Sequence, residues 1–349
     1  MPLALSRRTL ISTAGAAVAA PRAAEAAVPK ITLWLDNVEE ASMRRVKQLG
    51  VDHVSMGGPR IPWDEARLRY IVERLKSAGL TLANVMIGGF PTAVYGRPGR
   101  DGEIDNVRES IRAAGRIGIP VVEYNFYAHR AVEGYYQEQG RGGAGLTAFD
   151  YDRVKDLPPL PQEGAHTLDE MWRNVTYFLK AVVPVAQEAG VRLALHPNDP
   201  PAPVSRGSGQ IMGSVEGWKR LIEIVPSPSN GITFDCGVTR EMGHDPVEAC
   251  RYFGSRDRIN HMHYRNVRMR VPREKYTETF LDEGEVDMFA VMKELVRQKY
   301  SQLIYPEHPP LLDADREQPS KGISPARYAG FAYTVGYARA MLQAALARA

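Results

Sequence analysis

The sequence has few cysteines, no excess of charge of one sign, and no long apolar run after its first residues. Two cysteines, Cys236 and Cys250, are too few for a disulfide framework in a chain of 349 residues. The 44 lysines and arginines against 41 aspartates and glutamates form no basic stripe, so we expect no nucleic-acid partner. No stretch after the N-terminal segment is long and apolar enough to span a bilayer, so we expect no membrane partner either.

The overall composition is that of a globular protein with a buried core. Hydrophobic residues make up 44% of the chain and charged residues 24%, which excludes a disordered, collagen-like or coiled-coil protein. A chain of this length forms either one large domain around a single core or two ordinary domains. This size favours a catalytic scaffold over a small binding module.

The first residues have the pattern of a twin-arginine export signal. The letters S-R-R-T-L-I begin at Ser6, a weakly apolar run extends to Ala20, and A-E-A around Glu25 is typical of a cleavage site. The alternative is an ordinary N-terminus in which two arginines are adjacent by chance. We expect residues 1–26 to be a signal peptide, residues 27–349 to be the catalytic domain, and the protein to be periplasmic or secreted.

Short β-branched runs alternate with amphipathic helical stretches along the rest of the chain. The strand candidates number eight, namely Ile31–Leu35, His53–Met56, Thr81–Ile87, Val121–Phe126, Arg192–His196, Gly231–Asp235, Arg258–His263 and Leu303–Glu307. The helical stretches that follow them lie near 39–49, 63–78, 103–117, 166–189, 214–224, 245–253, 286–298 and 325–347. Strict alternation implies parallel pairing, and this number of units closes a barrel, so we predict an α/β fold, a single-domain (β/α)8 TIM barrel.

Two stretches exceed what the barrel itself requires, since such a barrel needs about 250 residues. They are the Gly/Pro-rich stretch 127–165 after the fourth strand candidate and the polar stretch 266–285 after the seventh. Both follow strands on the face where these barrels carry their active sites. Each insertion is therefore either a lid over the site or a loop without a function.

Titratable side chains stand at the ends of four consecutive strand candidates, where such a barrel has its active site. They are His196, Asp235, His263 and Glu307, and His308 follows directly. A single histidine or aspartate at a strand end is usually structural or caps a helix, but several in register on adjacent strands favour a bound divalent metal. The mixed set of nitrogen and oxygen ligands suits Mn²⁺, with Mg²⁺, Fe²⁺ and Co²⁺ as alternatives.

Motifs along the whole chain after the signal segment resemble the mannonate dehydratase family, a branch of the xylose-isomerase-like TIM barrels. In the family's order they are Y-G-R-P-G-R-D-G-E-I-D-N from Tyr95, V-V-E-Y-N-F from Val121, H-P-N-D-P-P from His196, G-I-T-F-D-C-G from Gly231, H-Y-R-N-V from His263, G-E-V-D-M from Gly284 and P-E-H from Pro306. The most specific of these are H-P-N-D-P-P and H-Y-R-N. The resemblance implies a xylose-isomerase-like barrel that is a metal-dependent hydro-lyase.

The resemblance also implies roles for individual residues. His196 and His263 match the two metal-binding histidines of the family. Asp235 stands where the family has a metal-binding cysteine, and Glu307 where it has a metal-binding aspartate. His308 matches a histidine implied in proton transfer. Tyr328 matches a tyrosine near the reacting carbons. The resemblance also implies three substrate-binding residues, which are Arg265, Asn266 and Asn125.

The sequence departs from the family pattern at Asn198, Asp235 and Tyr305. The family's H-P-D-D-P-P is H-P-N-D-P-P here, its metal cysteine is an aspartate with Cys236 next to it, and the arginine usual before P-D-H is a tyrosine. Aspartate and glutamate bind metals in the wider isomerase and epimerase barrels, so we expect metal binding to persist. Loss of the arginine removes a planar bidentate partner for a carboxylate, which bears on the choice of substrate.

These observations predict a hydro-lyase that converts a small sugar acid, D-mannonate, to 2-keto-3-deoxy-D-gluconate. His308 and Tyr328 would be its acid–base pair, in an order that the sequence does not determine. One alternative is a divalent-metal-dependent sugar isomerase or epimerase, whose product keeps the mass of its substrate. Another is an exported barrel that only binds sugars. Assembly into a homo-oligomer is left open.

Overall fold

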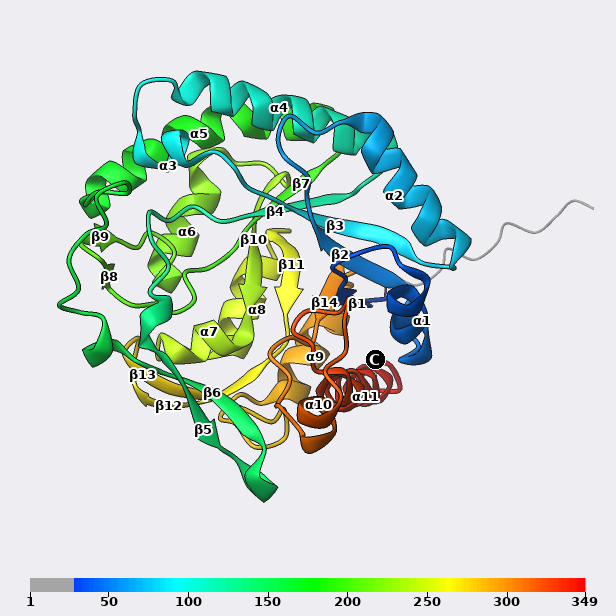
Figure 1. Cartoon of the computed structure of the whole chain (residues 1–349). Helices are drawn as coiled ribbons and strands as arrows, with labels where there is room; N and C mark the ends of the chain where they lie inside the picture. The colour runs from blue at the N-terminus through cyan, green and yellow to red at the C-terminus, as the bar shows by residue number, and fades with distance from the viewer. Residues whose placement is uncertain (1–27, 349) are drawn as a thin grey trace, which may run out of the picture.

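A closed barrel of parallel strands forms the centre of the protein (Figure 1). The computed structural model describes residues 28–348, and the expected signal segment lies outside these residues. Within them, eight strands close the barrel in the order β1-β14-β11-β10-β7-β4-β3-β2. The barrel strands are β1 (Lys30–Trp34), β2 (His53–Gly57), β3 (Thr81–Ile87), β4 (Val121–Tyr124), β7 (Arg192–Leu195), β10 (Asn230–Asp235), β11 (Ile259–His263) and β14 (Leu303–Tyr305). The prediction of a single-domain (β/α)8 barrel is confirmed.

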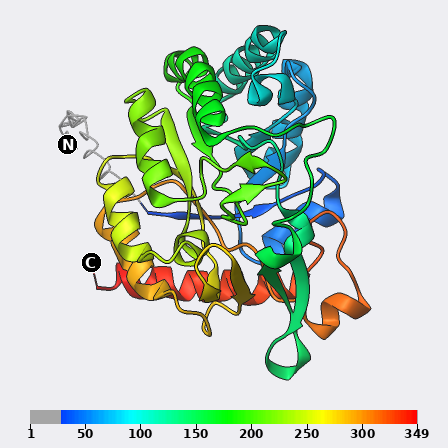
Figure 2. The same cartoon turned by 90° about the vertical axis from the view of Figure 1, so that its left-hand side faces the viewer.

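Helices surround the barrel and bury their apolar faces against its strands (Figures 1 and 2). The longer ones are α1 (Glu40–Gln48), α2 (Glu65–Ser77), α4 (Arg100–Ile117), α5 (Leu168–Glu188), α6 (Val215–Ile224), α8 (Pro246–Gly254), α9 (Met288–Arg297) and α11 (Tyr328–Leu346). Shorter ones are α3 (Pro91–Tyr95), α7 (Cys236–Glu241) and α10 (Asp313–Glu317), and 3-10 turns are η1 (Val132–Gly134), η2 (Arg141–Gly143) and η3 (Tyr151–Arg153). Within the described range, no helix combines the length and apolar character that crossing a membrane requires.

Local sequence explains where α5 begins and which face it buries. Thr167 and Glu170 form a capping box, in which the Glu170 amide donates to the Thr167 hydroxyl at 3.2 Å and the Thr167 amide donates to the Glu170 carboxylate at 2.8 Å. Met171, Val175 and Phe178 then recur at helical spacing and are fully buried. This face holds the helix on the outside of the barrel.

Four of the predicted strands end one or two residues earlier than expected, and two of these differences concern the site. β7 ends at Leu195 and β14 at Tyr305, so His196 and Glu307 lie in the loops just after them. The His196 amide still donates to the Tyr124 carbonyl at 2.9 Å, whereas the Glu307 amide turns back to the Tyr305 carbonyl at 2.9 Å. Both side chains therefore stand at the C-terminal mouth of the barrel.

The two insertions meet in a second, antiparallel sheet, which the sequence did not predict. Its order is β12-β13-β6-β5, with β5 (Tyr135–Gln139) and β6 (Gly145–Asp150) from the first insertion and β12 (Asn266–Val271) and β13 (Lys275–Thr279) from the second. Register pairs Tyr276 with Phe149 where the two insertions join. Figure 1 shows the β5–β6 hairpin extending beyond the rim of the barrel. A small hairpin of β8 (Val204–Ser205) and β9 (Ser208–Gly209) completes the strands of the described residues.

Candidate active site

A cavity of about 540 Å³ opens at the C-terminal ends of the barrel strands. One part of its wall consists of residues at or after strand ends, among them His196, His263 and Glu307. Another part comes from the second sheet, through Tyr135, Thr147 and Glu278. The insertions predicted as candidate lids therefore contribute directly to the wall of the cavity.

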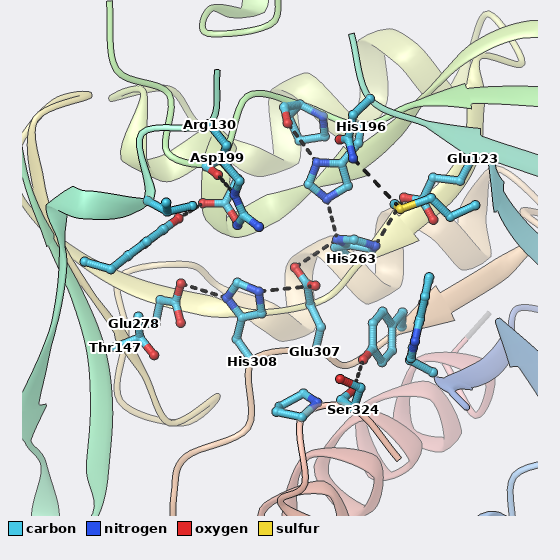
Figure 3. A pocket seen from close by; sticks show the side chains of 18 of the residues that line it. Glu123, Arg130, Thr147, His196, Asp199, His263, Glu278, Glu307, His308 and Ser324 are labelled. Carbon is cyan, nitrogen blue, oxygen red and sulfur yellow. Dashed lines mark hydrogen bonds and ion pairs between the residues drawn. The ribbon is translucent and has the colours of Figure 1, made fainter. Parts of the chain in front are cut away.

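His263, the last residue of β11, is the centre of a cluster of potential metal ligands (Figure 3). Its Nδ1 atom lies 3.3 Å from His196 Nε2 and 2.8 Å from Glu307 Oε1. The Oδ2 atom of Asp235, the last residue of β10, lies 3.8 Å from the same nitrogen. The structure thus brings together all four residues that the sequence predicted as ligands.

A hydrogen bond behind the His196 ring directs its other nitrogen toward His263. His196 Nδ1 lies 2.8 Å from the Pro197 carbonyl, which can only accept, so this nitrogen carries the proton and Nε2 carries the lone pair. His263 Nε2 lies 3.6 Å from Glu123 Oε1, which is too far for a hydrogen bond, whereas its Nδ1 lies 2.8 Å from Glu307 Oε1. The lone pair of His196 and the Glu307 carboxylate therefore both face His263 Nδ1, an arrangement that a cation at their centre would stabilise.

Glu307 supplies an oxygen that has no hydrogen-bond partner. Its Oε1 atom is buried and makes no hydrogen bond, although it lies near His263 and 3.3 Å from Arg265 Nε. Burial alone would raise the pKa of this carboxyl, but the positive charges favoured on His263 and His308 hold it well below its usual value. An ionised carboxylate oxygen beside two imidazole nitrogens fits a divalent cation.

The pKa values of the two histidines shift in opposite directions. Burial, with a smaller contribution from His263, lowers the pKa of His196 to about 3, so its imidazole is neutral as a metal ligand must be. Burial also opposes charge on His263, but the carboxylates of Glu307, Glu123 and Asp235 outweigh it and raise its pKa. The cluster therefore attracts positive charge at the position where His263 Nδ1 faces Glu307.

Asp235 is more firmly held by protein groups than the other three residues. Its Oδ1 accepts the Val238 amide at 2.8 Å and caps α7, and its Oδ2 accepts Arg265 Nε at 2.9 Å. Burial raises the pKa of Asp235 to about 6, although Arg265 opposes this shift. Asp235 could reach a cation through Oδ2 while keeping both bonds.

Arg265, predicted to hold the substrate, is instead buried beneath the cavity. Only 1% of its surface is exposed. Besides its bond to Asp235, its Nη1 donates to Glu241 Oε1 at 2.6 Å, and its Nη2 lies 3.4 Å from Asp199 Oδ1. The guanidinium therefore neutralises buried carboxylates and is not available to a ligand.

Asn266 and Tyr328 also lie away from the cavity wall. The Asn266 amide nitrogen donates to the Leu281 and Val286 carbonyls at 2.9 and 3.2 Å, and its oxygen accepts the Val286 amide at 2.9 Å, so the side chain fastens a loop. The Tyr328 hydroxyl lies at the start of α11 and donates to Gln48 Oε1 on α1 at 3.3 Å. Neither residue is therefore placed for the role that the resemblance implied.

Asn125 and His308 do line the cavity. The Asn125 amide nitrogen has only a long contact of 3.9 Å with Met86 Sδ, which leaves it free for a ligand. His308 Nδ1 lies 2.7 Å from Glu278 Oε1, and Nε2 lies 3.4 Å from Glu307 Oε2. Burial opposes charge on His308, but these two carboxylates outweigh it and raise its pKa to about 9.

Sequence reasoning assigned no role to three carboxylates of this site, which are Glu123, Asp199 and Glu278. Glu123 lies within β4, where its oxygens accept Asn84 Nδ2 at 2.7 Å and Thr233 Oγ1 at 2.8 Å. A glutamate inside the apolar run V-V-E-Y was a signal that could have revealed it, since a buried charge needs a reason. Glu278 lies in β13, and the sequence of the insertion gives no sign that it would reach His308.

The closed barrel of this chain has the same fold class as the xylose isomerase domain proteins, since the one from Planctomyces limnophilus has a TM-score of 0.58 at 14% identity, covering 91% of this chain and 99% of that one. Within this class, the sequence model of the family D-mannonate dehydratase (UxuA) matches residues 28–161 and 165–348. The chain therefore belongs to the mannonate dehydratase family, a family of hydro-lyases.

Individual relatives agree with this assignment. The mannonate dehydratase of Thermotoga petrophila is 30% identical over 311 residues, which cover 78% of this chain and 85% of the relative. The mannonate dehydratase of Lactococcus lactis subsp. cremoris is 27% identical over 297 residues, which cover 75% of this chain and 82% of the relative. The crystal structure of mannonate dehydratase from Streptococcus suis serotype 2 has a TM-score of 0.80 at 28% identity, covering 91% of this chain and 96% of that one.

Isomerase and epimerase structures are more distant. The 3-keto-D-glucoside 4-epimerase of Escherichia coli has a TM-score of 0.55 at 16% identity, covering 89% of this chain and 99% of that one. Similarity at this level shows the shared barrel fold alone. The family match therefore supports the dehydratase over the isomerase or epimerase that the sequence left as an alternative.

Proposed function

We propose that this protein dehydrates D-mannonate to 2-keto-3-deoxy-D-gluconate with the help of a divalent cation. The observation that carries the proposal is the convergence of His196, His263, Asp235 and Glu307 at the mouth of the barrel. The names of the relatives supply the substrate, and the size of the cavity is compatible with a linear six-carbon acid.

These four residues would hold the cation, and we propose Mn²⁺ because imidazole and carboxylate ligands together suit it. Mg²⁺, Fe²⁺ and Co²⁺ are the alternatives to be compared with it. When bound, such a cation is a Lewis acid that stabilises negative charge developing on the oxygens of the substrate.

His308 is the residue best placed to move a proton. Dehydration breaks the C2–H and C3–O bonds, forms a C2=C3 double bond, and releases water; the resulting enol becomes the 2-keto acid. Glu278 holds His308 Nδ1, so the ring presents Nε2 beside Glu307 at the cavity wall. In this position His308 acts either as the general acid that protonates the departing hydroxyl or as the general base that removes the proton from C2.

Aromatic side chains form part of the cavity wall beside the site. Trp34 and Tyr305 line the cavity, and the Tyr305 hydroxyl is engaged with the Ser324 carbonyl at 3.1 Å. Their rings form an apolar wall at the end of β14, where the family has an arginine. We propose that this wall shields the enol from unwanted reactions.

A mass-resolved turnover assay tests the proposed function. The metal-loaded chain is offered D-mannonate, other aldonates and neutral ketoses, with a chelator-treated sample as control. We expect D-mannonate to lose one water in the presence of Mn²⁺ and to stay unchanged after chelation. An isomer of unchanged mass as the product would contradict the proposal.

We also propose that residues 1–26 direct export of the folded protein, leaving residues 27–349 as the catalytic domain. The support is the S-R-R-T-L-I pattern and the small-residue site that follows it. The test replaces Arg7 and Arg8 with lysine and follows the protein in periplasmic and cytoplasmic fractions. Unchanged export by the double variant would contradict the twin-arginine route.

A further inference from the structure

Arg327 is an arginine at the cavity wall whose charge is not paired with a carboxylate among the described residues. It precedes α11, and its Nη1 donates to the Pro309 carbonyl at 2.7 Å. We propose that Arg327 binds the carboxylate of the substrate acid. The inference rests on the proposed function, because it presumes an acid as substrate.

The other cations of the cavity wall already have anionic partners (Figure 3). Arg130 donates through Nε to the Asp199 carbonyl at 2.5 Å, and its Nη2 lies 3.2 Å from Asp199 Oδ2. His308 lies between Glu278 and Glu307. Neither side chain can bind a second carboxylate without giving up the first.

The two carboxylates that act on Arg327 are engaged elsewhere, Glu278 with His308 and Asp315 with α11. Asp315 is buried, and its two oxygens accept the Ala329 and Gly330 amides at 2.8 and 3.0 Å, which satisfies the N-terminus of α11. The pKa values of Arg327 and Arg130 agree with an unpaired Arg327 and a paired Arg130. Burial lowers the pKa of Arg327, whereas Arg130 has its pKa raised because Tyr135 and Asp199 outweigh burial.

An acid that enters this cavity needs such a free cation. The wall carries the carboxylates of Glu123, Asp199, Glu278 and Glu307, which repel an anion. A cation held by the His263 cluster would attract the oxygens at one end of the substrate. The unpaired guanidinium of Arg327 can donate two parallel hydrogen bonds to a carboxylate, a geometry that also selects an acid over a neutral sugar.

The test compares an acid with its neutral isostere. The ligands are 3-deoxy-D-mannonate, which lacks the hydroxyl that would leave and so cannot be dehydrated, and its primary amide. Binding of each to the full chain is measured by calorimetry in Mn²⁺. We expect the wild type to prefer the acid, and Arg327→Gln to weaken acid binding by about 10- to 100-fold while changing amide binding less than about threefold.

Two further variants distinguish binding of the substrate carboxylate by Arg327 from a purely structural role of this residue. Arg327→Lys keeps the charge without the planar fork, so part of the preference for the acid should persist. Arg339→Gln is the matched control, since Arg339 lies on the same helix and donates to the Gly50 carbonyl far from the cavity. It should retain the wild-type preference for the acid.

Two results would overturn the proposal. If Arg327→Gln weakens both ligands equally, Arg327 only holds the Pro309 loop. If the preference for the acid survives in both Arg327 variants, another group binds the carboxylate. Because the ligands do not react, this test is independent of D-mannonate turnover, whose absence in the wild type would contradict the proposed function and not this inference.

Discussion

His308 adopts a backbone conformation that is unusual for its residue type. Its φ angle is 49°, which lies in the left-handed region. For a residue with a Cβ atom this region is higher in conformational energy, so the surroundings must compensate. The compensation here is the pair of carboxylates on either side of its ring, Glu278 and Glu307. This strained turn directs the imidazole into the cavity, which an extended backbone after β14 would not do.

Replacing His308 with alanine should remove most of the activity without removing the metal. Loss of a group that moves a proton in the reaction typically slows turnover by about 100-fold or more. We therefore expect His308→Ala to lower kcat for D-mannonate by this amount, with unchanged metal content by elemental analysis. Full turnover by this variant would show that another group transfers the proton.

Tyr328→Phe should have almost no effect. The hydroxyl that this change removes lies against Gln48 on the outside of the barrel and not in the cavity. We expect kcat and KM to stay within about twofold of the wild type, as for most surface changes. A large fall in kcat would mean that the start of α11 moves Tyr328 into the cavity during turnover.

At the scale of elements, the second sheet connects the two insertions and completes the cavity. Its strands carry Tyr135, Thr147 and Glu278 to the wall. Its own small core contains Phe149, whose ring lies 5.5 Å from both Tyr135 and Tyr276. The sheet is thus a separate layer over the mouth of the barrel, with a core that does not continue the main one.

Phe149→Ala should loosen this sheet and spare the barrel. Removing a fully buried phenylalanine costs about 3–5 kcal/mol of local stability. We expect faster hydrogen exchange in β5, β6 and β13, and a raised KM for D-mannonate because Glu278 and Tyr135 lose their fixed positions. Hydrogen exchange followed by mass spectrometry, together with steady-state kinetics, measures both effects.

Phe253→Ala is the matched control for this change. Phe253 is also fully buried, but it lies on α8 at the outside of the barrel, 5.9 Å from Trp218. This variant should unfold at a lower temperature and keep the KM of the wild type. An equal rise in KM for both variants would show that the second sheet has no separate role in binding.

For the whole molecule, the buried carboxylates at the barrel mouth outnumber the positive groups beside them. Arg265 lies within 4 Å of carboxylates from five places in the chain, which are Asp199, Asp235, Glu241, Glu278 and Glu307. One guanidinium and the neighbouring histidines are few positive groups for so many acids. A divalent cation between His196, His263 and Glu307 would relieve the remaining repulsion across the barrel mouth.

Removing the metal should therefore destabilise the entire barrel. Saturating metal at about 100 times its dissociation constant contributes about 2.7 kcal/mol, which corresponds to a fall in Tm of about 5 °C on chelation. Thermal unfolding with and without chelator measures this shift. Glu307→Gln should lose the shift, and Glu188→Gln, which changes an exposed residue at the end of α5, should keep it. A shift that persists in Glu307→Gln would place the metal elsewhere.

Sequence reasoning predicted the barrel because its signals are local. Each unit carries its own apolar period and turn residues, and the hydrogen-bonded order of the strands follows from their parallel alternation. The positions of His196, Asp235, His263 and Glu307 followed as well, since the C-terminal ends of parallel strands meet at one rim. These assignments needed no knowledge of any contact between distant segments.

Other properties depended on contacts that no local pattern encodes. Arg265 and Asn266 belong to a specific motif, but only the packing of the chain decides that both are buried and bonded to other protein groups. Glu278 reaches His308 because two insertions far apart in the sequence pair through backbone hydrogen bonds. The sequence by itself determined the fold and the rim that carries the chemistry, since these follow from periodicity. Only the tertiary structure decided which charges face the cavity and which neutralise each other beneath it, because burial and ion pairing depend on every segment at once.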